Sequence, residues 1–166
     1  MRADDLKVSL PIVRRETTAA EAGRLIAESA LVGLVIANER GTPTAIVSAV
    51  DVLRLMVPGY LLDDVSLAAV FDEDAAGEAW EHIAQRTVGD LLDDEGVAVH
   101  RILSLDSDAT LVEIAARMVD ARTQIALLRD SPPGSPMFVT LPAVISAVLA
   151  SAAGTGGGTG AGTGEQ

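Results

Sequence analysis

The stretch Thr18-Ala19-Ala20-Glu21-Ala22 decides the fold, because its pattern returns 92 residues later as Thr110-Leu111-Val112-Glu113-Ile114. The same shift places Ile46-Val47-Ser48 on Phe138-Val139-Thr140 without a gap. A gapless register over about 40 residues that keeps two polar capping positions indicates an internal repeat. We therefore interpret the chain as two copies of one structural unit.

The unit reads as strand, helix, strand, strand, helix. In the first copy, Thr18-x-x-Glu21 is a capping box, and helical spacing follows it through residue 30. Residues 32–37 and 45–47 predict strands, and Ser48 caps a helix over 50–56. The second copy predicts a helix over 111–121, strands over 124–128 and 137–139, and a helix after Thr140. The leading segments, 12–13 and 102–103, complete each unit if they are extended.

This order predicts an α/β (α+β) fold of small sheets packed with helices. Because such a small sheet buries only one face against its own helices, we expect the two copies to pack on each other. We place the first repeat at 1–58, an acidic helical linker at 59–86, and the second repeat at 87–150. Residues 151–166 are rich in Gly and Thr and predict a disordered tail. Residues 87–92 lead into the second copy, and residues 3–6 resemble a degenerate counterpart of that segment before the first copy.

Charge is concentrated between the repeats. The chain has 166 residues and a net charge of -12, from 24 acidic and 12 basic residues. The window 60–95 holds eleven acidic residues and only one basic residue, so it supplies 11 − 1 = 10 of the 12 net negative charges. This acidity argues against nucleic-acid binding, which needs a basic surface. We expect a helix over 72–85 and expect Tyr60, Phe71 and Trp80 to anchor the linker onto the module.

Other compositional features exclude further classes. The chain has no cysteine, which excludes disulfides and thiolate metal sites. No stretch has the length of a membrane span, and the first residues have no signal-peptide pattern, so we expect a cytoplasmic protein without membrane insertion. No nucleophile–base pair or cofactor loop is recognisable, so we expect neither an enzyme nor a resident cofactor. Glu78, Glu81 and His82 read as a solvated helix face, and no metal site is expected.

Together these motifs resemble a CBS domain pair, the Bateman module named after cystathionine β-synthase. The resemblance rests on the Thr18 and Thr110 helix starts, the apolar strands behind them, and Ser48-Ala49-Val50-Asp51. It implies two repeats related by a pseudo-two-fold axis, and modules that often associate into a disc, hence a homodimer. It also implies that the cleft between the copies binds an adenosine-type ligand such as AMP, ATP or S-adenosylmethionine, with a regulatory rather than catalytic effect.

The resemblance points to one site in detail. In nucleotide-binding relatives, an aspartate at the position of Asp51 accepts hydrogen bonds from ribose hydroxyls, beside a Ser or Thr at the position of Ser48. The alternative is that Ser48-x-x-Asp51 only caps a helix. In the second copy Thr140 keeps the hydroxyl, but position 143 is alanine, so we expect at most one ribose-type site. Arg122 is a candidate for phosphate contact or else a solvated helix-end cation, and Arg14 and Arg15 are weaker candidates.

Two functions remain open on the sequence. The first is a stand-alone regulatory module that binds an adenosine-type ligand and acts in trans on a partner, because no effector domain is recognisable. The second is a dimerisation or protein-interaction module without a ligand. The missing aspartate in the second copy and the scarcity of basic phosphate residues favour the second function.

Overall fold

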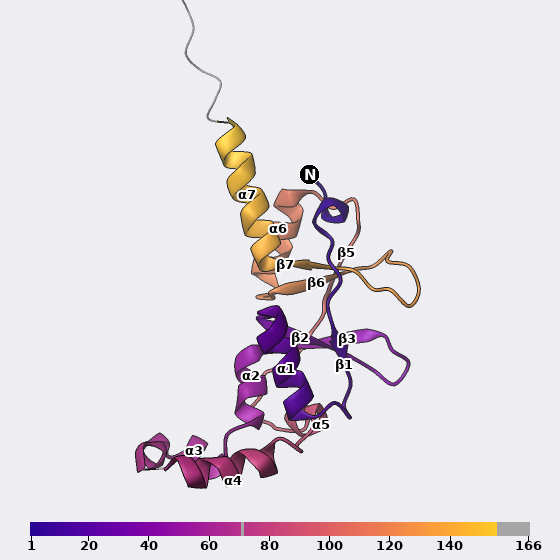
Figure 1. The fold of residues 1–166 in the computed structure, drawn as a ribbon. Helices are drawn as coiled ribbons and strands as arrows, with labels where there is room; N and C mark the ends of the chain where they lie inside the picture. The colour runs from indigo at the N-terminus through magenta and orange to yellow at the C-terminus, as the bar shows by residue number, and fades with distance from the viewer. Residues whose placement is uncertain (71, 156–166) are drawn as a thin grey trace, which may run out of the picture. The chain divides into compact units, whose positions relative to one another are not determined.

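The computed structural model describes residues 1–70 and 72–155 and divides the chain into two compact units (Figure 1). One unit comprises Ser9–Ile102. The other joins Met1–Val8 to the part of the chain that begins at Leu103. Each unit has its own sheet and its own hydrophobic core.

The Ser9–Ile102 unit is built on a four-stranded sheet in the order β1-β2-β3-β4. The first strand pairs parallel to the second, and the other neighbours are antiparallel. The strands are β1 (Ile12–Val13), β2 (Gly33–Ala37), β3 (Pro43–Ser48) and β4 (His100–Arg101). Its repeat helices are α1 (Ala19–Ser29) and α2 (Ala49–Leu55). Every residue of β2 is buried, as expected for a short apolar run.

The second unit has a three-stranded sheet in the order β5-β6-β7. Its strands are β5 (Leu103–Leu105), β6 (Ile125–Leu128) and β7 (Phe138–Thr140), and its helices are α6 (Leu111–Asp120) and α7 (Leu141–Thr155). This mixed arrangement of small sheets and helices confirms the predicted fold class.

The strand register carries the 92-residue repeat down to single residue pairs. Val35 pairs with Ile46 in one sheet, and Leu127 pairs with Phe138 in the other. Ala30, directly after α1, and Arg122, two residues after the end of α6, each have a φ of 49°. A left-handed residue at this position ends a helix and turns the chain toward the next strand.

Both cores are aliphatic, as the scarcity of aromatic residues predicts. Leu34, Val47 and Val52 are buried at the centre of one unit, and Ile114, Met118 and Val139 at the centre of the other. Full burial of one such side chain contributes about 1.5–3 kcal/mol, so each small sheet is held mainly by these contacts. Phe138 is also fully buried.

The short segments before the repeats pack with the opposite repeat from the one they precede. The 3-10 helix η1 (Ala3–Leu6) lies in the second unit, where the Ala3 amide donates to the Ala109 carbonyl at 3.0 Å. Helix α5 (Val88–Leu92) lies in the first unit, where the Val88 amide donates to the Thr17 carbonyl at 2.8 Å. Each compact unit therefore contains the short segment that precedes the other repeat, which differs from the repeat boundaries expected from sequence. The physical reason is that buried Ala3, Val88 and Leu91 complete those cores.

The acidic linker contains α3 (Gly59–Asp63), the 3-10 helix η2 (Val65–Val70) and α4 (Glu73–Ile83). Asp72 caps α4, since its carboxylate accepts from the Ala75 amide at 2.8 Å. The expected aromatic anchors are not buried: Tyr60 is 51% exposed and Trp80 is 49% exposed, and Phe71 lies outside the described residues. Leu61 and Ile83 are the buried linker side chains instead.

The last helix is longer than expected. α7 continues past residue 150 to Thr155, because the alanines at 152 and 153 favour continuation of the helix. The remainder of the predicted tail, residues 156–166, lies outside the described residues. Over the described ranges, none of the helices is both long enough and apolar enough to cross a membrane.

Candidate functional site

Ser48 and Asp51 lie together where β3 passes into α2. Ser48 has extended backbone angles, φ -74° and ψ 158°, and is the residue that caps α2. Its Oγ accepts a hydrogen bond from the Asp51 amide at 3.1 Å and donates one to Asp51 Oδ2 at 2.7 Å. Both side chains are half-buried. The structure thus brings together two of the predicted site residues in a fixed geometry.

Close strand packing fixes the position of Ser48. Gly33 is its partner across the sheet, and a Cβ added to Gly33 would lie 2.6 Å from the Val47 carbonyl oxygen. The Ala49 amide also donates to the Val32 carbonyl at 2.9 Å. The start of α2 is therefore tied to the start of β2, and only glycine permits this close approach without a shift.

The Asp51 carboxylate has one oxygen committed and one available. Oδ2 accepts from the Ser48 hydroxyl, and no hydrogen bond to Oδ1 is found among the residues the structure describes. A carboxylate held in this way is a fixed acceptor for a hydroxyl donor such as a ribose diol. The same two bonds also stabilise the first turn of a helix, so the geometry is equally that of a cap.

An ion pair that sequence inspection missed holds the far end of α2. Arg54 Nε lies 3.2 Å from Asp94 Oδ2, and both side chains are about one third exposed, at 39% and 33%. The Gly96 backbone amide, with a smaller contribution from Arg54, lowers the pKa of Asp94 below its ordinary value. The two residues are 40 apart in sequence, so no local pattern could have revealed the contact.

The second copy has the backbone of the site without its carboxylate. The Leu141 amide donates to the Gln124 carbonyl at 2.8 Å, which repeats the Ala49–Val32 bond of the first copy. Thr140 is half-buried at the end of β7, and no hydrogen bond of its side chain is found in the described part of the chain. Ala143 occupies the position equivalent to Asp51 and offers no acceptor.

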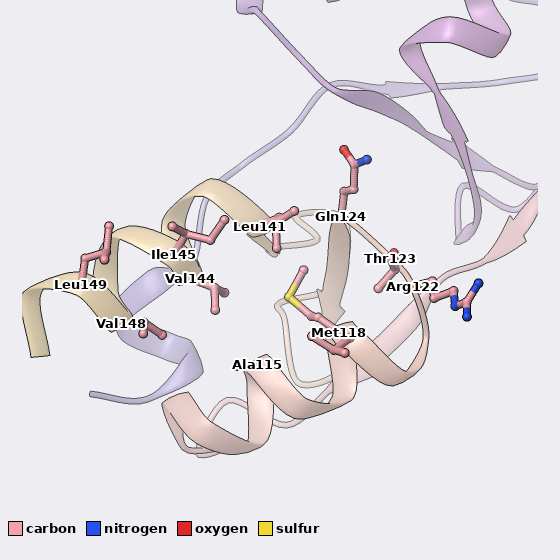
Figure 2. A pocket seen from close by; sticks show the side chains of 11 residues that line it. Ala115, Met118, Arg122, Thr123, Gln124, Leu141, Val144, Ile145, Val148 and Leu149 are labelled. Atoms are coloured by element: carbon pink, nitrogen blue, oxygen red, sulfur yellow. The ribbon is translucent and has the colours of Figure 1, made fainter. Parts of the chain in front are cut away.

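Arg122 lies at the edge of an apolar hollow of about 440 Å³ between α6 and α7. Figure 2 shows Met118 on α6 facing the α7 side chains, while the Arg122 guanidinium points away from them. Arg122 is exposed, and no ion pair to it is found within the described ranges. The cation is thus accessible, beside a hollow whose other walls are mainly aliphatic.

Arg14 and Arg15 lie at the other end of their sheet from Ser48. They border a hollow of about 350 Å³ with Asn38 and Glu39, beyond the last residue of β2. Ser48 pairs with Gly33, the first residue of β2, and four strand steps separate the two ends by roughly 13 Å. Arg15 is also paired with Asp93 at 2.7 Å. Neither arginine is therefore placed beside the Asp51 carboxylate.

Within residues 1–70 and 72–155, no group of three or more His, Asp or Glu side chains is arranged to hold a metal ion.

Comparison with known proteins identifies the class. No family sequence profile matches the chain, and no curated protein matches it. Among solved structures, the chain is similar to a CBS domain-containing protein of unknown function from Kribbella flavida, with 29% identity, a TM-score of 0.73 and coverage of 90% of this chain and 99% of that one. The chain therefore has the fold of a CBS domain pair, as the repeat predicts.

Two further similar structures contain nucleotides. The CBS-pair protein CBSX2 from Arabidopsis thaliana, in complex with AMP, has 18% identity, a TM-score of 0.58, and coverage of 91% of this chain and 98% of that one. The CBS domain of a bacterial CNNM/CorC family Mg²⁺ transporter, in complex with ATP, has 15% identity, a TM-score of 0.58, and coverage of 90% and 87%. At these identities the likeness concerns the fold.

Proposed function

We propose that this chain is a regulatory CBS-pair module that binds an adenosine-type ligand through Asp51 and acts in trans on a partner. The observation that carries the proposal is the half-buried Ser48–Asp51 pair. The Ser48 hydroxyl donates to Asp51 Oδ2 and fixes the carboxylate, which leaves Oδ1 available to a ligand. A ribose hydroxyl that donates to this charged acceptor contributes about 1.5–3 kcal/mol. The AMP and ATP complexes of similarly folded proteins support an adenosine-type ligand.

The ligand binds once per chain in this proposal, because Ala143 leaves the second copy without an acceptor. Thr140, a hydroxyl, and Arg122, an exposed cation, remain candidate contacts on the second copy that the sequence suggests. No side chain beside Asp51 on α2 supplies a free cation, since Arg54 is paired with Asp94. A ligand with little negative charge, such as S-adenosylmethionine, therefore fits the site as well as ATP does.

Isothermal titration of the purified chain with AMP, ATP and S-adenosylmethionine tests the proposal. We expect saturable heat with at least one of them, at a stoichiometry close to one ligand per chain. Incubation with ATP should release no ADP or AMP, because the module is regulatory rather than catalytic. Absence of heat with all three ligands would exclude the adenosine-type site.

A second function, dimerisation without a ligand, is favoured by the outer face of α6 and α7. Val112, Val119 and Leu149 are 78%, 75% and 65% exposed on these helices. Two adjoining hollows, of about 440 and 750 Å³, lie over the same helices and are lined mainly by aliphatic side chains, and Figure 2 shows the first of them. Soluble monomers rarely expose contiguous apolar surface of this kind, so a second copy is a suitable cover. The mass of the chain in sedimentation equilibrium distinguishes a dimer from a monomer, with and without ligand.

A further inference from the structure

The acidic linker exposes large apolar side chains that the fold does not use. Among the described residues of the linker, 59–70 and 72–86, only Leu61 and Ile83 are buried, at 9% and 8% exposure. Val65 and Val70 in η2 are 73% and 81% exposed, and Trp80 in α4 is 49% exposed. Exposed apolar surface at this density costs solubility and marks interaction sites in soluble proteins.

Helix α4 is amphipathic, but its apolar side is only partly covered. Ala76, Ala79, Trp80 and Ile83 follow the i, i+3, i+4, i+7 spacing of one helix face. Of these four residues only Ile83, at the end of the helix, is buried. The apolar face of α4 is therefore buried at its C-terminal end, at Ile83, and remains exposed around Trp80.

The charges of the linker are uncompensated. Its seven carboxylates are Asp63, Asp64, Asp72, Glu73, Asp74, Glu78 and Glu81. The ion pairs found among the described residues use Lys7, Arg15, Arg54, Arg117 and Arg129, and each pairs with an acid outside the linker. The linker sequence contains one arginine, Arg86, against these seven exposed carboxylates, so the carboxylates repel one another and attract a cationic partner.

From these contacts we infer that the linker is a docking surface for a basic amphipathic helix of a partner protein. The apolar side of that helix covers the Trp80 face of α4, and its lysines or arginines face the carboxylates of α4. Aromatic residues of this kind carry a large share of binding energy at interfaces, and complementary charge raises the association rate. This inference goes beyond ligand binding, because it concerns a different surface and a macromolecular partner.

Charge complementarity selects this occupant over others. A second copy of the chain has a net charge of -12 and would bring like charges to an acidic surface. Nucleic acids and anionic membranes are repelled for the same reason. A basic segment with an apolar face is the partner chemistry that satisfies both the carboxylates and the exposed side chains.

The test uses the full chain and a fluorescein-labelled 18-residue peptide of Leu and Lys, with all leucines on one helical face. A second peptide has the same composition, but its leucines are spread around the helix. Binding is measured by fluorescence anisotropy in about 150 mM salt, where long-range attraction is screened. Trp80 is the chain's one tryptophan. A shift of its fluorescence emission when the unlabelled peptide is added therefore reports contact at α4. We expect saturable binding of the amphipathic peptide, a blue shift of Trp80, and at least about tenfold weaker binding of the scrambled peptide.

Two variants locate the surface. Neutralising α4 with Glu73→Gln, Asp74→Asn, Glu78→Gln and Glu81→Gln should weaken amphipathic-peptide binding by about tenfold or more. The matched control removes four exposed charges elsewhere, with Glu16→Gln, Glu28→Gln, Glu39→Gln and Asp120→Asn, and should change binding less than about twofold. Trp80→Ala keeps every charge and should also weaken binding by about tenfold. Circular dichroism checks that each variant is folded.

Three results would overturn the inference. Equal losses in the α4 variant and the matched control would mean attraction to net charge alone. Equal binding of the two peptides would mean that the apolar face of the amphipathic peptide does not contribute to binding. An unchanged Trp80 emission maximum at saturation would place the peptide elsewhere on the chain. None of these results depends on AMP, ATP or S-adenosylmethionine, so they are independent of the proposed ligand site.

Discussion

Replacing Gly33 with alanine should destabilise the first unit and displace the Ser48–Asp51 pair. The added Cβ would lie 2.6 Å from the Val47 carbonyl oxygen and 3.5 Å from the Ser48 Cα. Carbon–oxygen contacts in sheets are ordinarily about 3.3–3.6 Å, so the two strands must separate locally by about 0.7–1.0 Å. Neither strand can yield easily, because β2 is entirely buried and Val47 is fully buried behind it. Overpacking of this kind costs about 1–3 kcal/mol of unfolding free energy.

Urea unfolding followed by circular dichroism measures this cost. Gly77→Ala is the matched control, because Gly77 lies in exposed α4 with nothing within 4 Å of an added Cβ. That control should raise rather than lower stability, by about 0.5–1 kcal/mol, since alanine favours a helix over glycine. If the unfolding free energy of Gly33→Ala lies within about 0.5 kcal/mol of that of the unmodified chain, then the close approach of the two strands at Gly33 does not fix the start of α2.

Three further changes test other parts of the account. Ala143→Asp completes Thr140-x-x-Asp in the second copy and should raise the ligand stoichiometry in calorimetry from one toward two per chain; an unchanged stoichiometry would show that the carboxylate alone does not make a site. The Thr18 amide, and secondly its hydroxyl, lower the pKa of Glu21. The Glu21 carboxylate therefore contributes its full stabilisation at pH values above the ordinary glutamate pKa. This stabilisation is lost as the pH falls through the lower pKa that Glu21 has in the folded protein. Glu21→Gln should flatten the acid side of the pH dependence of the unfolding free energy, and a profile identical to that of the unmodified chain would refute the capping-box contribution. Val119→Asp places a charge on the 75% exposed apolar face of α6 and should shift a dimer to monomer in sedimentation equilibrium, and an unchanged mass would exclude this face as the interface.

The repeat could be predicted from sequence because its signals are local and occur twice. Thr18 and Thr110 are both helix caps in the structure, each accepting from the amide three residues on. The apolar runs behind them form strands whose pairing repeats at the same 92-residue interval, as in Gly33 with Ser48 and Ile125 with Thr140. Each capping position gains independent support from its counterpart, which is why the register could be inferred.

The exchange of short segments could not be predicted, because segments of four and five residues carry no information about which core they join. Val88 and Leu91 fill a gap beside α2, and Ala3 fills one beside Ala109. These choices depend on the shape of a cavity formed by distant residues. The same reason explains the Arg54–Asp94 ion pair, whose partners are 40 residues apart and meet where α2 and α5 pack together.

The candidate site was only partly predictable. The Ser48–Asp51 contact follows from local helix capping, and the structure has it at 2.7 Å. The surroundings of Arg122 depend instead on how α7 lies against α6, so the apolar hollow beside it had no sequence signature. Aromatic bulk does not by itself decide burial in the linker: Tyr60 and Trp80 are about half exposed, the aliphatic Leu61 and Ile83 are buried, and the expectation for Phe71 lies outside the described residues.

Calorimetric titration of Asp51→Ala beside Asp90→Ala tests the central claim most directly. Thr87 and Asp90 form a related hydroxyl–carboxylate contact at the start of α5 in the same unit, and Asp90 also accepts from the Thr87 amide, so Asp90→Ala loses at least as much helix capping as Asp51→Ala does. One lost hydrogen bond to a charged acceptor is worth about 1.5–3 kcal/mol. We therefore predict that Asp51→Ala weakens binding of the adenosine-type ligand by about tenfold to a hundredfold, while Asp90→Ala leaves it unchanged. Equal affinity in the two variants would contradict a ligand-binding role for Asp51 and leave Ser48-x-x-Asp51 as a helix cap.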